Sequence, residues 1–299
     1  MPSVTQHLTD LGLIRPPKFL PTNVMYETLM GSVAYGCSMD DSDRDVFGFC
    51  IPLKDEVFPH LAGEIVGFGT PPKRFEQFQQ AHIRDESALG GKGVEYDLSI
   101  YNIVRYFTLC MECNPNMIDS LFTPQDCVLH LTRVGSLVRE QRRLFLHKGC
   151  WPRFKGYAYS QLHKMRGKEP IGKRKALHEE FGFDVKFAYH VVRLLGECEQ
   201  MLIEGDMDLR RNREHLKAIR RGEVSQEDIL KWASDKERQL EQLYVDSKLP
   251  AVPDEARIKT LLLNCLEEHY GKLDDCVVRV DAATTALREI QSVLERYRS

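Results

Sequence analysis

The chain lacks the features that mark several classes of protein. No uninterrupted apolar run in its 299 residues approaches the ~18 that a membrane helix needs. The first residues, MPSVTQHLTDLGLIRPP, contain neither the basic start nor the apolar core of a secretory signal. The sequence has no internal repeat and no low-complexity tract. With 42% hydrophobic and 28% charged residues, it is predicted to be a soluble globular protein rather than a disordered or fibrous one.

Disulfide bonds are also not expected. The chain has nine cysteines, an odd number, and it is too long to need covalent staples for stability. Reduced thiols point to a cytosol-like compartment, so we expect a cytoplasmic protein.

The net charge of −3 is small, but the charges are unevenly distributed. Residues 38–56 contain six acidic and two basic side chains, whereas residues 139–175 contain twelve basic and two acidic ones. A second basic block, from Arg210 to Arg221, has six basic residues and one acidic residue. An acidic spot beside a basic surface suits a polyanionic substrate that is held together with a metal ion.

The hydrophobic pattern changes along the chain. Short β-prone runs at 23–30, 45–52 and 92–100 are separated by glycine and proline clusters. From Ile100 the periodicity becomes helical, and helices are predicted at 153–166, 184–204, 207–221, 225–244, 254–270 and 280–297. We therefore expect an α/β domain over residues 1–150 and an all-helical domain over residues 151–299.

Two short motifs carry the chemistry. Asp43 and Asp45 are two residues apart at the start of a β-prone run, so their carboxylates should share one face of a strand. Paired carboxylates of this kind suit Mg²⁺ bound together with substrate phosphates. Earlier in the chain, a predicted strand runs into Gly31 and Ser32, which open a turn or short helix. Backbone N–H groups and a serine hydroxyl at that position favour a phosphate.

The spacing of these motifs resembles a known signature. Asp43 and Asp45 follow Gly31 by twelve and fourteen positions, as in nucleotidyltransferases of the DNA polymerase β type. The small residues expected between them in the minimal members of that superfamily are here Ala34, Gly36 and Ser42.

The similarity extends over residues 23–225. It is carried by GSVAYG…SDRDVFGFCIP, VEYDLSIYNIVRYFTLCMECNPNMIDSLF, FGFDVKFAYHVVRLL and LKAIRRGEVS. These segments resemble a predicted nucleotidyltransferase family associated with RNA-repair ligases. The resemblance implies an α+β fold, in which a small mixed sheet is flanked by helices and is followed by a helical region. It also implies transfer of a nucleotidyl group from an NTP with two divalent metal ions.

Two-metal chemistry requires a third acid. In the segment VEYDLS, strand alternation places Glu95, Asp97 and Ser99 on one face. The resemblance places the third acid at Asp97, and Glu95 is the alternative. A strand with one solvated face would give the same pattern without any function.

A cationic stripe lies on a predicted helix. Lys186, His190 and Arg193 follow the helical spacing among mostly apolar neighbours, so a buried helix would need an anionic partner for them. The resemblance supports the triphosphate of an NTP as this partner. Alternatively, the stripe faces water or pairs with structural acids such as Asp184.

The first basic block interleaves aromatic residues with its charges. Cations on phosphates and rings stacked on bases are typical of single-strand binding. The candidate RNA contacts are Arg142, Arg143, Lys148, Arg153 and Lys155, and the aromatic residues are Phe145, Trp151, Phe154, Tyr157 and Tyr159. In the alternative interpretation, the aromatic rings are core residues and the charged residues form a solvated face. The stretch Lys168–Lys175 is predicted to be a mobile loop.

Four residues have spacing that a zinc site could use, namely Cys110, Cys113, Cys127 and His130. The first two lie in a helical pattern, and the resembled family has no metal site there. Buried free thiols are the favoured interpretation.

The sequence as a whole predicts a nucleotidyltransferase that depends on Mg²⁺ or Mn²⁺. Asp43 and Asp45 would hold both ions, and Asp97 would hold the catalytic ion and help to deprotonate the acceptor hydroxyl. Gly31 and Ser32 would hold the β- and γ-phosphates of an NTP, ATP being the favoured one. The favoured acceptor is an RNA end, with protein and small-molecule hydroxyls left open. A catalytically silent RNA-binding module and a metal-dependent phosphoesterase are the alternatives.

Overall fold

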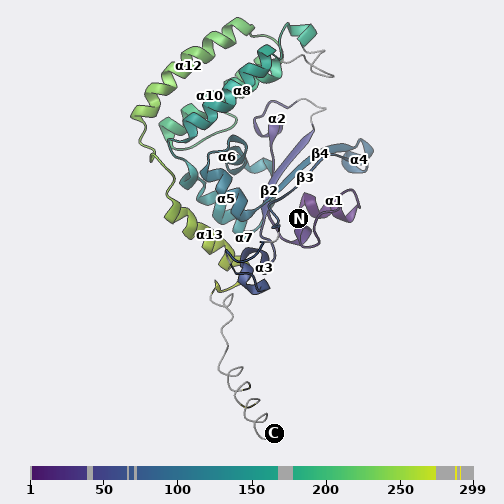
Figure 1. Ribbon diagram of the computed structural model, residues 1–299. Helices are drawn as coiled ribbons and strands as arrows, with labels where there is room; N and C mark the ends of the chain where they lie inside the picture. Colours follow the sequence, from purple (N-terminus) through teal and green to yellow (C-terminus); the bar gives the residue numbers. More distant parts are fainter. Residues whose placement is uncertain are drawn as a thin grey trace.

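The computed structural model describes residues 2–38, 43–65, 67–70, 73–167 and 178–273, together with Leu287 and Ile290. Within this part of the chain, strands β1 (Val24–Leu29), β2 (Arg44–Cys50), β3 (Gln77–Asp85), β4 (Val94–Asn102) and β5 (Val128–Leu131) form one sheet in the order β3-β4-β2-β1-β5. Strands β2 and β4 are parallel, and the other neighbours are antiparallel. This mixed sheet with flanking helices confirms the predicted α+β class (Figure 1).

Three of the strands, β1, β2 and β4, lie where the hydrophobic pattern predicts them. Strand β4 alternates between buried and half-buried residues along most of its length. Strands β3 and β5 were not predicted. β3 is an edge strand with the sequence QFQQAHIRD, largely exposed, so it lacks the hydrophobic alternation by which strands are recognised. β5 has only four residues.

One face of the sheet is covered by the N-terminal segment. Helix α1 (Val4–Asp10) and the residues after it pack Leu8, Ile14 and Leu20 against apolar side chains of β2 and β4. A buried carboxylate fixes the start of this helix, because Glu27 of β1 accepts hydrogen bonds from the backbone N–H groups of Val4 at 2.5 Å and Thr5 at 3.0 Å. Burial raises the pKa of Glu27.

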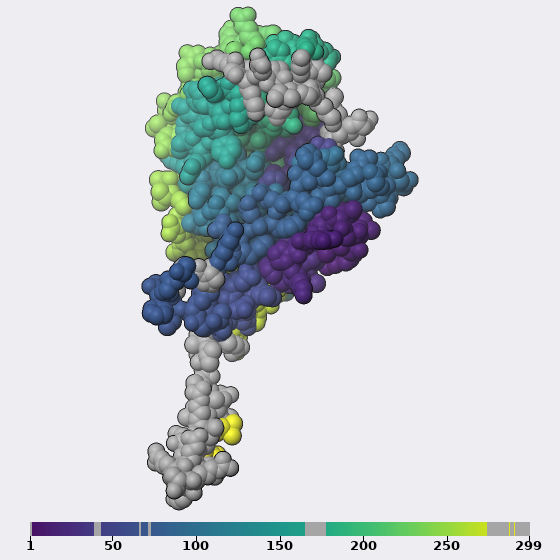
Figure 2. Space-filling view, turned by 45° about the vertical axis from the view of Figure 1, so that its right-hand side comes forward, coloured from purple at the N-terminus to yellow at the C-terminus, as the bar shows by residue number. Residues whose placement is uncertain are grey.

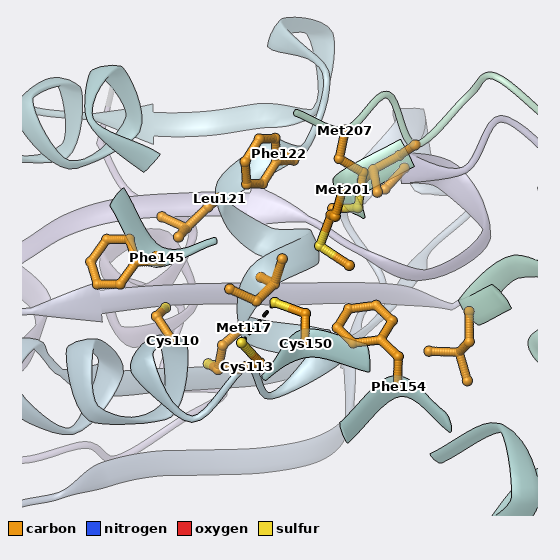
Figure 3. Close-up of a cluster of buried hydrophobic side chains, with 14 of the residues drawn as sticks. Cys110, Cys113, Met117, Leu121, Phe122, Phe145, Cys150, Phe154, Met201 and Met207 are labelled. Atoms are coloured by element: carbon orange, nitrogen blue, oxygen red, sulfur yellow. Dashed lines mark hydrogen bonds between the residues drawn. The ribbon is translucent and has the colours of Figure 1, made fainter. Parts of the chain in front are cut away.

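The opposite face carries the main hydrophobic core. Helices α5 (Ile103–Met111), α6 (Pro115–Phe122) and α7 (Arg133–Glu140) lie next to the sheet, and α8 (Cys150–Gly167) and α10 (Val185–Glu204) lie beyond them (Figure 1). Figure 3 shows the sulfur atoms of Cys113 and Cys150 beside Met117, with Met201 and Phe154 on one side and Cys110 and Phe145 on the other. The predicted end of the first helix before Asn114 and Pro115 is confirmed, since Asn114 caps α6 and Pro115 is its first residue.

The later helices largely match their predicted ranges. Helices α8, α10, α12 (Gln226–Asp246) and α13 (Glu255–Tyr270) begin and end within a few residues of the predicted limits. Helix α11 (Arg213–Arg220) is shorter than predicted, because Asp208 is not helical and its backbone is instead bonded to the side chain of Gln200 at 2.9 and 3.2 Å. The predicted loop Lys168–Lys175 lies outside the described residues, as does the helix at 280–297 apart from Leu287 and Ile290.

The hydrophobic core continues across residue 150, where the domain boundary is predicted. The same cluster contains Phe49 and Phe107 from the first half of the chain and Phe154 and Val191 from the second. The division into domains 1–150 and 151–299 therefore stays a prediction. The eight described cysteines are all free and buried, as expected for reduced thiols. Among the described helices, none combines the length and the hydrophobicity needed to cross a membrane.

Candidate active site

Two of the predicted catalytic acids stand opposite each other in the sheet. In the parallel pair β2 and β4, Asp45 is in register with Asp97, and both are half-buried. Their neighbours Val46 and Leu98 point to the other face and are buried there, which confirms the predicted alternation. Asp43 is exposed and immediately precedes the first residue of β2. The structure thus brings the three predicted acids to one edge of the sheet.

The electrostatics of this edge favour a cation. Burial raises the pKa of Asp45, and the negative charges of Asp97 and Asp43 raise it further, whereas Lys186 on α10 lowers it. Each of these charged groups is therefore close enough to Asp45 to act on it. A divalent ion would relieve the repulsion among the carboxylates, and carboxylate oxygens are the ligands that Mg²⁺ and Mn²⁺ prefer. The donor set fits the implied metal ions.

The glycine–serine motif lies directly against Asp45. Gly31 begins the short helix α2 (Gly31–Ala34) with a φ of +64°, and a Cβ atom at this position would lie 2.2 Å from Oδ2 of Asp45. The backbone N–H of Met30 also donates a 2.7 Å hydrogen bond to the carbonyl of Asp45. Ser32 is half-buried beside it. The predicted phosphate-binding motif and the predicted metal-binding motif therefore lie side by side. Figure 2 shows purple atoms of the N-terminal part of the chain in the recess between the teal and the blue segments.

The second basic block braces the loop after this motif. Arg210 donates to the carbonyl of Ala34 at 3.3 Å, and Arg220 donates to the carbonyl of Cys37. Gly36 has a φ of +67°, and a Cβ atom there would lie 3.5 Å from the side chain of Arg210. In the sequence, these arginines indicate only a basic surface. Their role in supporting the loop depends on contacts across more than 170 residues, for which the sequence carries no signal.

The predicted third acid, Asp97, is hydrogen-bonded to the edge strand β3. The backbone N–H of His82 donates to Oδ1 of Asp97 at 2.8 Å, and the His82 ring is 2.6 Å from Oε1 of Glu95. Ligand atoms of His82, Glu95 and Asp97 lie within 4.8 Å of one another, and this is the one such group of possible metal ligands among the described residues. Both acids are thus bonded to His82, Glu95 through the ring and Asp97 through the backbone N–H, and Asp97 is the one in register with Asp45. The sequence did not point to His82, because this residue lies in β3, whose largely exposed side chains lack the hydrophobic alternation of a strand.

The cationic stripe on α10 has two different environments. Lys186 is exposed in the first turn, close to Asp45, and His190 is half-buried against the ring of Tyr189. Arg193 is only 6% exposed and donates to Asp119, to Glu197 at 3.1 Å and to the hydroxyl of Tyr35 at 2.8 Å.

The alternative interpretation, pairing with structural acids, thus describes Arg193. Its partners are Asp119 and Glu197 rather than Asp184, which instead caps α10 by accepting from the backbone N–H of Lys186 at 2.9 Å.

Most cations of the first basic block have partners within the protein. Lys155 pairs with Glu237 at 2.9 Å and with Glu241 at 2.5 Å, and Arg143 pairs with Asp206. Arg142 lies over the ring of Phe122 and donates to the carbonyl of Arg139 at 2.9 Å, and Lys148 donates to the carbonyl of Val245 at 3.0 Å. Arg153 is exposed, and no ion pair joins it to another described residue.

The aromatic residues of this block divide in the same way. Phe145, Trp151 and Phe154 are buried in the core, as the alternative interpretation held. Tyr157 and Tyr159 are 40% and 49% exposed, so their rings can contact a ligand.

The residues considered for zinc have separate partners. Cys113 contacts Cys150 at 2.7 Å, Cys127 accepts from Arg210 at 3.3 Å, and the His130 ring lies 3.2 Å from the carbonyl of Val24. In the described part of the chain, these side chains and Cys110 form no group of ligands. The favoured interpretation of buried free thiols agrees with this arrangement.

Comparison with known proteins agrees with this geometry. No curated protein matches the chain. The model of the RlaP family, described as the RNA repair pathway DNA polymerase beta family, matches residues 18–264 and thereby covers Gly31, Asp43, Asp45 and Asp97. The chain belongs to this family of polymerase-β-like nucleotidyltransferases.

Proposed function

We propose that the protein transfers a nucleoside monophosphate from an NTP to a hydroxyl group at an RNA end, with release of pyrophosphate. The observation that carries the proposal is the convergence of Asp43, Asp45 and Asp97 beside Gly31 at one edge of the sheet. In the transfer, a bond forms between the acceptor oxygen and the α-phosphorus, and the bond from the α-phosphorus to the bridging oxygen breaks.

The three acids have distinct roles in this proposal. Asp43 and Asp45 hold two ions, Mg²⁺ or Mn²⁺, and Asp97 completes the ligands of the ion next to the acceptor. When bound, such ions lower the pKa of the acceptor hydroxyl and neutralise charge on the phosphates. Asp97 also helps to take the hydroxyl proton, which is consistent with its half-buried position facing Asp45.

The nucleotide lies between the glycine–serine motif and α10. Gly31 and Ser32 hold the β- and γ-phosphates, and Lys186, which is exposed and close to Asp45, supplies positive charge. His190 lies one turn further along the same helix face. Arg193 is bonded to buried acids, so we assign it to supporting Tyr35, three residues after Ser32, rather than to the triphosphate.

An RNA acceptor is supported by the family to which the chain belongs. Arg153 and the exposed rings of Tyr157 and Tyr159 are the members of the first basic block placed for contact with it. The cations that are already paired, such as Lys155, have a smaller role in this proposal.

The decisive experiment incubates the protein with RNA, Mg²⁺ or Mn²⁺ and each NTP labelled at the α-phosphate. We expect label in RNA together with release of pyrophosphate, and no label with Asp45→Asn. Release of phosphate without labelled RNA would indicate a phosphoesterase. If the protein binds RNA but transfers no label from any of the NTPs, it would be a catalytically silent binding module.

A further inference from the structure

We propose that a bulge in strand β3, formed by Ala81 and His82, positions Asp97 as the third acid and keeps Glu95 from that role. This inference rests on the proposed function, since it assigns the support of one of the metal ligands.

The bulge is visible in the strand register. Along the pair β3 and β4, Gln80 is opposite Leu98 and Ile83 is opposite Tyr96, so Ala81 and His82 together face the single residue Asp97. Both bulged residues are exposed, which breaks the alternation of the strand at this point. Bulges of this kind often lie next to active sites, where they redirect a side chain.

The bulge redirects a backbone donor to Asp97. His82 has a φ of +56°, in the left-handed region that a residue with a Cβ atom rarely adopts. In this conformation its N–H is not used in the ladder but is donated to Oδ1 of Asp97 at 2.8 Å. That bond fixes the carboxylate orientation and leaves Oδ2 for a metal ion. Backbone strain that a structure retains beside a site is typical of a functional constraint.

The same residue also engages the competing acid. Glu95 shares a strand face with Asp97, and both are half-buried. The His82 ring lies 2.6 Å from Oε1 of Glu95, so this carboxylate is bonded on the side away from Asp45. His82 thus contacts both acids on this face of β4. Its ring binds Glu95, and its backbone N–H orients Asp97.

Deletion of Ala81 tests the role of the bulge. It would leave one residue opposite Asp97 and keep Gln80 opposite Leu98 and Ile83 opposite Tyr96, so the strand becomes regular without a change in its buried face. We expect a melting temperature equal to or above that of the intact protein, because the left-handed residue is no longer needed. The affinity for Mn²⁺, measured by electron paramagnetic resonance without nucleotide, should fall about 10- to 100-fold, as for the loss of other contacts that orient a metal ligand. Ala81→Gly keeps the bulge and should retain the affinity.

Combination with variants of the two acids shows whether the bulge acts through Asp97. In an Asp97→Asn background, deletion of Ala81 should cause no further loss of Mn²⁺ affinity, whereas Glu95→Gln alone should change the affinity less than threefold. A Glu95→Gln variant that loses as much affinity as Asp97→Asn would overturn the inference, as would wild-type affinity after deletion of Ala81. This comparison of Glu95 and Asp97 also decides the case if the deletion variant does not fold. If Asp97→Asn itself binds Mn²⁺ as the wild type does, Asp97 is not a metal ligand, and this result contradicts the proposed function rather than the role of the bulge.

Discussion

Gly31 and Asp45 are in such close contact that no larger residue fits at the glycine. A Cβ atom on Gly31 would lie 2.2 Å from Oδ2 of Asp45, well inside the distance at which such atoms repel. The contact joins the end of the first strand to a carboxylate of the second. It makes the glycine a requirement of the site for two separate reasons, its positive φ and its missing side chain.

These two reasons can be separated by a matched pair of variants. Gly31→Ala and Gly12→Ala both place a Cβ atom at a positive φ, +64° and +71°, but only the first contacts another group. Each should lower the free energy of unfolding by about 1–2 kcal/mol through the left-handed conformation. Gly31→Ala should in addition lower the rate of nucleotidyl transfer by about 10²-fold, because a displaced Asp45 no longer holds its ion. Equal activity of the two variants would contradict this description of the motif.

The acids at the sheet edge should be dispensable for folding and essential for activity. Asp43→Asn and Asp45→Asn should each reduce transfer by about 10³-fold or more, since a metal ligand supplies several kcal/mol of transition-state stabilisation. Because burial and neighbouring carboxylates raise the pKa of Asp45, its neutral replacement should keep or raise the melting temperature. Asp55→Asn, at an exposed acid on α3 (Lys54–Val57), is the control and should change neither quantity. Wild-type turnover in both site variants would refute the assignment.

Lys186 should contribute to nucleotide binding without contributing to the fold. An NTP with Mg²⁺ raises the melting temperature of a protein that binds it only when folded. Lys186→Ala should reduce this shift and leave the melting temperature of the unliganded protein unchanged, because the side chain is exposed. Lys231→Ala, at an exposed lysine on α12, should retain the full shift. An identical shift in both variants would remove Lys186 from the site.

The buried group around Arg193 predicts a dependence of stability on pH. Two carboxylates, Asp119 and Glu197, share one guanidinium, and burial raises the pKa of both carboxyl groups, that of Glu197 well above its ordinary 4.5. A raised pKa in the folded state means that folding favours the protonated form. The free energy of unfolding should therefore be highest at acid pH and fall as the pH rises through the folded-state pKa of Glu197.

Urea unfolding between about pH 5 and pH 9 would measure this dependence. In Glu197→Gln the fall with rising pH should be largely absent, so the variant should equal or exceed the wild type at the alkaline end. Arg193→Met should instead lose about 3–5 kcal/mol, because two buried carboxylates are left without a cation. A stability profile that is the same in the wild type and Glu197→Gln would show that Glu197 does not titrate in this range.

The first basic block offers a test of RNA binding by the dependence on salt. Arg153→Ala should lower the slope of log K against log salt by about 0.7–0.9, whereas Lys155→Ala should change it less, because Lys155 already pairs with two glutamates. Tyr157→Ala should weaken binding by about 1–3 kcal/mol for each stacked base and leave the slope nearly intact. Binding that does not respond to salt, or no binding at low salt, would argue against RNA as the acceptor.

The sequence alone determined the local parts of this protein. Periodicities of two and 3.6 residues can be recognised within a short segment. They predicted strands β1, β2 and β4, the long helices, and the shared face of Glu95 and Asp97. The spacing from Gly31 to Asp43 and Asp45 predicted the polymerase-β-type superfamily, and the further segments over residues 23–225 predicted the RNA-repair family to which the chain belongs.

Only the tertiary structure decided which partners the charged residues have. Arg193 and Lys186 are two turns apart on one helix, yet one is bonded to buried acids and the other is exposed beside Asp45. The edge strand β3 and its bulge at His82 could not be predicted either, since an exposed strand needs no apolar pattern. Periodicity depends on neighbours along the chain and can therefore be recognised in a short segment. The partner of a charged side chain depends on which distant segments pack together in the core, and a local sequence pattern does not contain that information.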